Sequence, residues 1–78
     1  MSIVPILKSR ELIAVLTKAG FRITRQTGSH VRLEHITDST RQTSVPQHSG
    51  FLPRWLLGAI LKQAKISVME LRRLLGKK

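Results

Sequence analysis

Residues 28–35 read Gly-Ser-His-Val-Arg-Leu-Glu-His (GSHVRLEH), and from His30 onward polar and apolar residues alternate. Such alternation is typical of a strand with one buried face, so Val31 and Leu33 are predicted to face the core. His35 falls on the same side, where packing is expected rather than catalysis. The residues expected on the exposed face are His30, Arg32 and Glu34. An exposed imidazole titrates near neutral pH and can exchange protons with a bound ligand, whereas the alternative is a solvated polar face without a chemical role.

Two further strands are predicted around this one. Residues 21–26 (FRITRQ) alternate as well, which indicates a half-buried strand with Phe21 and Ile23 inward. Thr27-Gly28 is a turn signal, so this strand and residues 29–35 are expected to pair as an antiparallel hairpin. Residues 36–40 are typical of a polar loop. Residues 41–45 (RQTSV) form the third predicted strand, with Thr43 and Val45 inward and Pro46 at its end.

Three helices are predicted from capping residues and periodic apolar residues. Ser9 is expected to cap the first, with Glu11 in a first turn that favours an anion and Lys18 near its end. The second begins at Leu52-Pro53, and the capping signature Ser67-Val-Met-Glu70 starts the third. The apolar stripes are Leu12, Ile13, Val15, Leu16 and Ala19, then Leu56, Leu57, Ile60, Leu61 and Ala64, then Val68, Leu71 and Leu75. The order predicts an α+β fold of helix, three-stranded antiparallel sheet and helix, with both helices on one face and a short C-terminal helix.

Length and cysteine content limit the class of protein. With 78 residues, of which 41% are hydrophobic, the chain provides material for one core, so residues 1–78 are expected to form a single domain. The absence of cysteine excludes a disulfide framework, a thiolate zinc site and a cysteine nucleophile. The sequence begins Met-Ser-Ile-Val-Pro-Ile-Leu, without a basic leader or a long apolar run, so a cytoplasmic protein that does not enter the membrane is expected.

Charge is the strongest global signal. Fourteen Lys and Arg residues stand against four Asp and Glu, which gives a formal net charge of +10. Such a balance favours a polyanionic partner, and in the cytoplasm that means nucleic acid. The alternatives are a generally basic soluble protein and one whose charge is neutralised by an acidic protein partner.

The side chains expected on the open face of the sheet are polar. They are Arg22, Thr24, His30, Arg32, Gln42 and Ser44. Sheets that bind single strands by stacking need exposed aromatic residues, but Phe21 is expected to point inward. This surface therefore suits recognition of the nucleic-acid backbone, or chemistry at a phosphate.

Four segments occur in a specific order along the chain. A glycine-aromatic pair starts the first strand, Gly-Ser-His opens the second, and Val45-Pro46-x-His48 closes the third. A leucine-rich second helix ends in Lys-Gln-Ala and is followed by Ile-Ser. Together these segments, over roughly residues 9–68, resemble the HicA family of toxins, which are small ribonucleases of bacterial toxin–antitoxin pairs.

This resemblance implies a fold like a double-stranded-RNA-binding domain, an mRNA interferase activity and inhibition by a HicB-type antitoxin. The family's catalytic histidine maps onto His30. The residues expected to contact RNA are Gly28, Ser29, Arg22, Arg32, His48 and Arg54. His48 is also a candidate for the second proton-transfer group, with a structural role as the alternative. No metal or cofactor is expected, because RNA supplies its own nucleophile in the 2′-hydroxyl and needs proton transfer and charge stabilisation.

The chain departs from the family pattern at two places. Residues 51–55 read Phe-Leu-Pro-Arg-Trp where a lysine-rich entry to the second helix is usual, which leaves Arg54 as the basic contact there. Lys65 replaces the glycine usual before Ile-Ser, so the second helix is expected to end differently.

A binding protein without catalysis is the competing class. Residues 56–75 are compatible with a helix-turn-helix in which Arg72 and Arg73 face DNA. Against this, the recognition helix would open with Val68 and Met69, which read bases poorly. A purely structural RNA binder is the third possibility. Cleavage that depends on His30 would distinguish the toxin from both alternatives.

Overall fold

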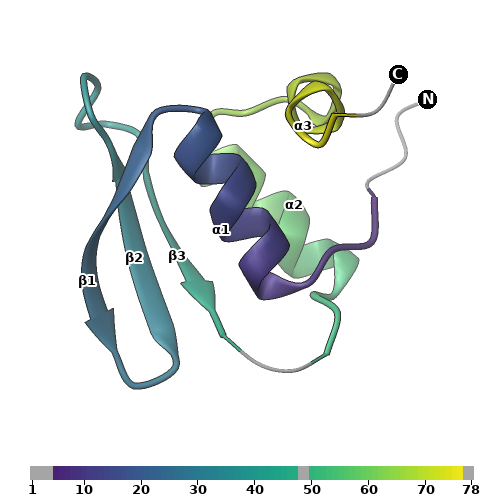
Figure 1. Ribbon diagram of the computed structural model, residues 1–78, viewed down its shortest axis with the longest axis horizontal. Coiled ribbons are helices and arrows are strands. Elements are labelled where there is room, and N and C mark those ends of the chain that lie inside the picture. The colour runs from purple at the N-terminus through teal and green to yellow at the C-terminus, as the bar shows by residue number, and fades with distance from the viewer. Residues whose placement is uncertain (1–4, 48–49, 77–78) are drawn as a thin grey trace.

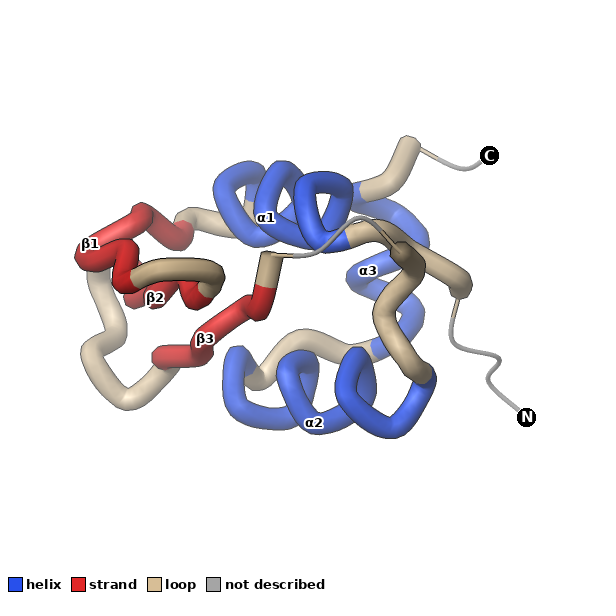
Figure 2. Tube along the Cα trace, turned by 90° about the horizontal axis from the view of Figure 1, so that it is seen from below, coloured by secondary structure: helices blue, strands red, loops and turns tan. Residues whose placement is uncertain are grey.

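The computed structural model describes residues 5–47 and 50–76. Along the chain the elements are α1 (Ser9–Lys18), β1 (Phe21–Thr27), β2 (His30–His35), β3 (Gln42–Pro46), α2 (Arg54–Ala64) and α3 (Val68–Leu74) (Figure 1). The three strands form one antiparallel sheet in the order β1-β2-β3. Both α1 and α2 lie on the same side of this sheet, as Figure 2 shows from below. The predicted α+β fold, like that of a double-stranded-RNA-binding domain, is confirmed.

The core lies between the sheet and the helices. Its fully buried side chains include Leu12, Leu16, Phe21, Val31, Leu33, Val45, Leu57, Ile60 and Leu71, so every element contributes. The inward positions predicted for β2 and β3 are therefore correct. Burying each large apolar side chain stabilises the fold by about 1.5–3 kcal/mol before chain entropy is set against it. None of the helices in the described residues lies on the opposite face of the sheet, which remains open there (Figure 2).

The predicted cap of α1 is wrong. Lys8 occupies the N-cap position, and its backbone N–H donates to the Glu11 carboxylate at 2.8 Å. Ser9 is the first helical residue and is 3% exposed, and its hydroxyl donates to the Pro46 carbonyl at 2.6 Å. That tertiary hydrogen bond fastens the start of α1 to the end of β3, which local capping preferences do not reveal. Glu11 lies in the first turn, as predicted.

Strand positions differ from the prediction in two respects. Ile23 lies opposite Leu33 on the helix side of the sheet but is 52% exposed, because β1 is an edge strand and the helices do not cover it there. The third strand runs one residue later than predicted: it begins at Gln42 and includes Pro46. Proline at the last position of an edge strand is allowed because no partner needs its missing N–H.

Arg41, just before β3, has a structural role. Its Nε donates to the Ala64 carbonyl at 2.8 Å, at the C-terminal end of α2, and its guanidinium lies 5.3 Å from the centre of the Phe21 ring. The His35 ring packs edge-on against the Phe21 ring, with the two ring centres 5.1 Å apart, as the predicted inward position of His35 requires. A carbonyl left unpaired at a helix end is thus satisfied by a cation.

The predicted start of α3 is confirmed, whereas both ends of α2 differ from the prediction. Pro53 is the N-cap of α2, so the helix begins at Arg54, just after the predicted Leu52-Pro53. Lys65 ends this helix with φ +59°, a left-handed conformation that glycine adopts more easily. The helix therefore terminates as a glycine would end it, and the expectation that it ends differently is wrong. Ser67 caps α3 as predicted, since its hydroxyl accepts from the Glu70 N–H at 3.0 Å. The hydrogen bond from Arg73 lowers the pKa of Glu70, and those from Thr40 lower the pKa of Asp38 in the β2–β3 loop.

Candidate nucleic-acid interface

The turn between β1 and β2 consists of Gly28 and Ser29. Gly28 has φ +56°, as the first position of a II′-type hairpin turn requires, and this is why glycine stands there. The Ser29 carbonyl accepts a hydrogen bond from the Gln47 N–H. This bond holds the end of β3 against the turn. His30, the first residue of β2, is thereby held between two fixed segments.

The open face of the sheet consists of three rows of residues that lie directly opposite one another across the strands. The first row is Thr27, His30 and Pro46, the second is Arg25, Arg32 and Ser44, and the third is Arg22, Glu34 and Gln42. Residues paired across antiparallel strands point to the same face, so each row presents its side chains together. His30 is exposed, and the row next to it holds two arginines. The face thus combines an accessible imidazole with concentrated positive charge.

Alternation alone does not predict Arg25 on this face. Strict alternation from Phe21 would place it on the helix side, but the register between β1 and β2 shifts between Ile23 and Arg25. Thr24 is the extra residue of this β-bulge, and a bulge re-aims the residues that follow it. Arg25 consequently lies opposite Arg32 and is exposed.

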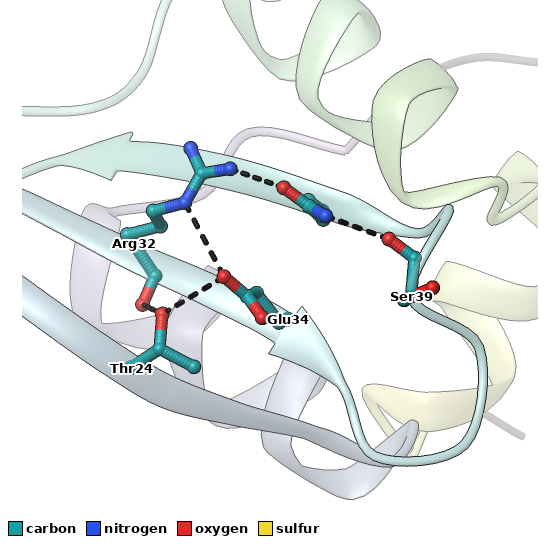
Figure 3. Close-up of polar contacts among 5 residues, drawn as sticks. Thr24, Arg32, Glu34 and Ser39 are labelled. Carbon is teal, nitrogen blue, oxygen red and sulfur yellow. Dashed lines mark hydrogen bonds and ion pairs between the residues drawn. The ribbon is translucent and has the colours of Figure 1, made fainter.

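Arg32 is held by neighbouring side chains of the sheet (Figure 3). Its Nε lies 3.5 Å from a Glu34 carboxylate oxygen, and its Nη2 donates to the Gln42 side-chain oxygen. Thr24 adds a 3.5 Å contact to the same carboxylate. Because Glu34 and Gln42 form the third row, the guanidinium extends away from His30. The ion pairs among the described residues are Arg32–Glu34 and Arg73–Glu70, so Arg25 has no carboxylate partner there.

Other predicted contact residues are spread more widely. Arg22 lies on the open face in the third row, opposite Glu34. Arg54 is the first residue of α2 and is exposed. His48 lies outside the described residues.

Exposed aromatic residues near the start of α2 were not predicted. Trp55 follows Arg54 and is 74% exposed, and Phe51 is 57% exposed with the Lys8 ammonium 5.4 Å from its ring centre. Their position beside a helix start, and the interruption of the apolar pattern at Pro53, were the available signals. Aromatic rings beside cationic groups suit contact with nucleotides.

The helix-turn-helix interpretation finds little support in the geometry of α3. Its seven residues begin with Val68 and Met69, which offer no hydrogen-bonding side chain, and Arg73 is paired with Glu70 at 2.6 Å. Within the described residues no helix is long and apolar enough to cross a membrane. The same residues hold no group of three or more His, Cys, Asp or Glu side chains that could bind a metal ion.

Comparison with known proteins gives one family. The family model described as HicA toxin of bacterial toxin-antitoxin matches residues 9–66, which include the whole sheet and helices α1 and α2. The comparison with curated proteins gives no match.

Proposed function

The chain belongs to the HicA family of bacterial toxin–antitoxin toxins, and from this we propose that it is an mRNA interferase, an endoribonuclease that uses His30. The observation that carries the proposal is the exposed imidazole beside a row of two arginines, on a face that none of the described helices covers. The net charge of +10 favours RNA as the polyanion, and the cytoplasm is where such a substrate is met.

The chemistry needs no nucleophile from the protein. The 2′ oxygen of the RNA attacks the adjacent phosphorus and the bond to the 5′ oxygen breaks, which leaves a 2′,3′-cyclic phosphate and a 5′-hydroxyl. One proton leaves the 2′-hydroxyl and one is delivered to the 5′ oxygen. His30 carries one of these transfers, as general base or general acid, and a second group or water carries the other.

Negative charge on the phosphate is balanced by the arginines of the second row. Charge-assisted hydrogen bonds to phosphate are strong, and the planar guanidinium matches the phosphate oxygens. Arg25 supplies this contact most directly because it has no carboxylate partner among the described residues. Arg32, Arg22 and Arg54, with the backbone of Gly28 and Ser29, extend the contact along the strand of RNA. His48 stays a candidate for the second proton transfer.

A toxin of this family acts together with an antitoxin, and we propose a HicB-type protein in that role. An acidic antitoxin laid over the open face would cover His30 and the arginines, and opposite charge would speed its capture. RNA and antitoxin would then compete for one surface.

The test is RNA cleavage by His30→Ala. Loss of a general acid–base costs about 10²–10⁴ in rate. His30 is exposed, so the variant is expected to fold as the wild type does. Thr27→Ala in the same row is the matched control. Cleavage should persist in EDTA and should stop on a substrate with one 2′-deoxy position at the cut. A folded His30→Ala protein that cleaves at the wild-type rate contradicts the proposal, and RNA bound but never cut by wild type favours a non-catalytic binder.

A further inference from the structure

A groove runs between the outer edge of β3 and helix α2. Its volume is about 470 Å³. Its lining includes Arg32, Gln42, Thr43 and Ser44 on the sheet side and Leu56, Ala59 and Gln63 on the helix side. The three helix residues recur at spacings of three and four, so they form one stripe along α2. Ala59, small and exposed, leaves the groove open at the middle of this stripe.

The two walls differ in character in a way that suits a planar aromatic ring. On the sheet side, the Arg32 guanidinium is kept in place by Glu34 and Gln42. On the helix side, Leu56 and Ala59 present apolar surface. Nucleobases stack on guanidinium planes and against apolar side chains, and this stacking does not depend on which base is bound.

Polar groups along the groove can read the edge of such a ring. The Thr43 hydroxyl donates to the Gln63 side-chain oxygen at 2.8 Å and thereby fixes the amide. The amide nitrogen of Gln63 then remains available to donate to a ligand. Ser44 adds a hydroxyl, and β3 is an edge strand, so its outer backbone groups face no further strand within the described sheet. Donors and acceptors therefore lie side by side.

The groove begins beside the candidate catalytic residue. Arg32 and Ser44 form the row adjacent to His30 and Pro46. Two residues along a strand span about 7 Å, a distance that a single nucleotide bridges. A base in the groove would thus belong to the nucleotide next to the phosphate at His30.

We propose that this groove binds one unpaired nucleobase of the RNA substrate and sets the sequence preference of cleavage. The proposal rests on the proposed ribonuclease function. Positive charge at one end and a stacking surface along both walls favour a nucleotide over a peptide strand added to the edge of β3.

The direct test fills the groove with Ala59→Leu, a change that keeps a good helix former. Ala14→Leu, an exposed alanine on α1, is the matched control. The probe is a labelled RNA oligonucleotide with a 2′-deoxy position at the cut, so that binding is measured without cleavage. We expect Ala59→Leu to weaken binding roughly 5- to 150-fold, as loss of one stacked base does, and Ala14→Leu to leave it unchanged.

A second variant tests the reading of the base and does not depend on the first. Gln63→Ala is expected to cleave RNA but with a weakened preference at one position beside the cut, as measured by sequencing the cleaved ends. If wild type cleaves RNA while Ala59→Leu and Gln63→Ala bind and cut as it does, the groove proposal is wrong and the ribonuclease function stands. If wild type does not cleave at all, the proposed function fails. Loss of antitoxin binding alone in Ala59→Leu would assign the groove to a protein partner and overturn the proposal.

Discussion

Replacing Arg25 by glutamine should lower activity and raise stability at the same time. Arg25 lies opposite Arg32 in the second row, and like charges directly opposite each other destabilise a strand pair. Removing one of them is expected to raise the free energy of unfolding by about 0.2–1 kcal/mol, toward the lower value because both side chains are exposed and screened by salt. If Arg25 served only to stabilise the fold, its replacement would instead lower the free energy of unfolding.

The fall in activity follows from the interaction with phosphate. A hydrogen bond to a charged group contributes about 1.5–3 kcal/mol, so kcat/KM should fall roughly 10- to 150-fold. RNA binding should also depend less on salt, with a log–log slope smaller by about 0.7 because one phosphate is no longer neutralised. Arg25→Lys keeps the charge but lacks the planar fork, and an intermediate activity is expected.

The assay pairs RNA cleavage and salt-dependent binding with urea denaturation. Arg10→Gln is the control, because it removes the same charge from an exposed position on α1, a helix that lies on the side of the sheet opposite the open face. If Arg25→Gln cleaves RNA as Arg10→Gln does, Arg25 does not hold the phosphate. If it lowers stability by more than about 1 kcal/mol, the like-charge reasoning is refuted.

Three further outcomes are expected. Lys65→Gly should raise the free energy of unfolding by about 1 kcal/mol, because Lys65 has φ +59°, which glycine adopts more easily. Lys62→Gly within α2 is the control and should lower the free energy of unfolding. Equal effects of the two substitutions in urea denaturation would contradict this. Hydrogen bonds from Thr40 lower the pKa of Asp38 in the folded state, so its contribution to stability is present above the unfolded pKa and is lost as pH falls. Asp38→Asn should therefore be less stable than wild type at neutral pH, and this difference should shrink as the pH falls through the folded-state pKa of Asp38. A difference that stays constant into acid would rule this out. Arg32→Glu should weaken both RNA and antitoxin binding, and saturating antitoxin should displace RNA; a stable ternary complex would show that inhibition works otherwise.

The buried half of the sheet could be predicted because alternation reports directly on burial. Val31, Leu33 and Val45 are fully buried as their parity requires, and Phe21 is too. Ile23 lies on the same face of β1 as Phe21 but is exposed. Alternation predicts the face on which a side chain lies, whereas the position of the helices decides whether that face is covered. The groove beside β3 could not be predicted for a related reason: it depends on where α2 lies.

The position of Arg25 was recoverable from the sequence, although alternation alone conceals it. A two-residue turn at Gly28-Ser29 places Thr27 opposite His30 and Arg25 opposite Arg32. Continued without interruption, that register would bring Arg22 rather than Phe21 to the face that Val31 occupies. The pairing set by the turn and the inward position of Phe21 are compatible only if β1 contains one extra residue. The seven residues of β1 do lie opposite the six of β2. A conflict between the register that a hairpin turn sets and the alternation of apolar residues along a strand thus indicates a bulge in that strand.

The bulge also links the register of the hairpin to function. If β1 continued the alternation that starts at the buried Phe21 without a bulge, Arg25 would lie on the helix side, and Arg32 would then be the one cation of its row, already bound to Glu34 and Gln42. With the bulge, the row next to His30 holds two cations, and one of them has no carboxylate partner among the described residues. Such an arrangement is unfavourable in the free protein and is relieved by any bound anion. RNA phosphate and an acidic antitoxin would both relieve it, so one local irregularity in β1 explains why substrate and inhibitor should compete for the same row.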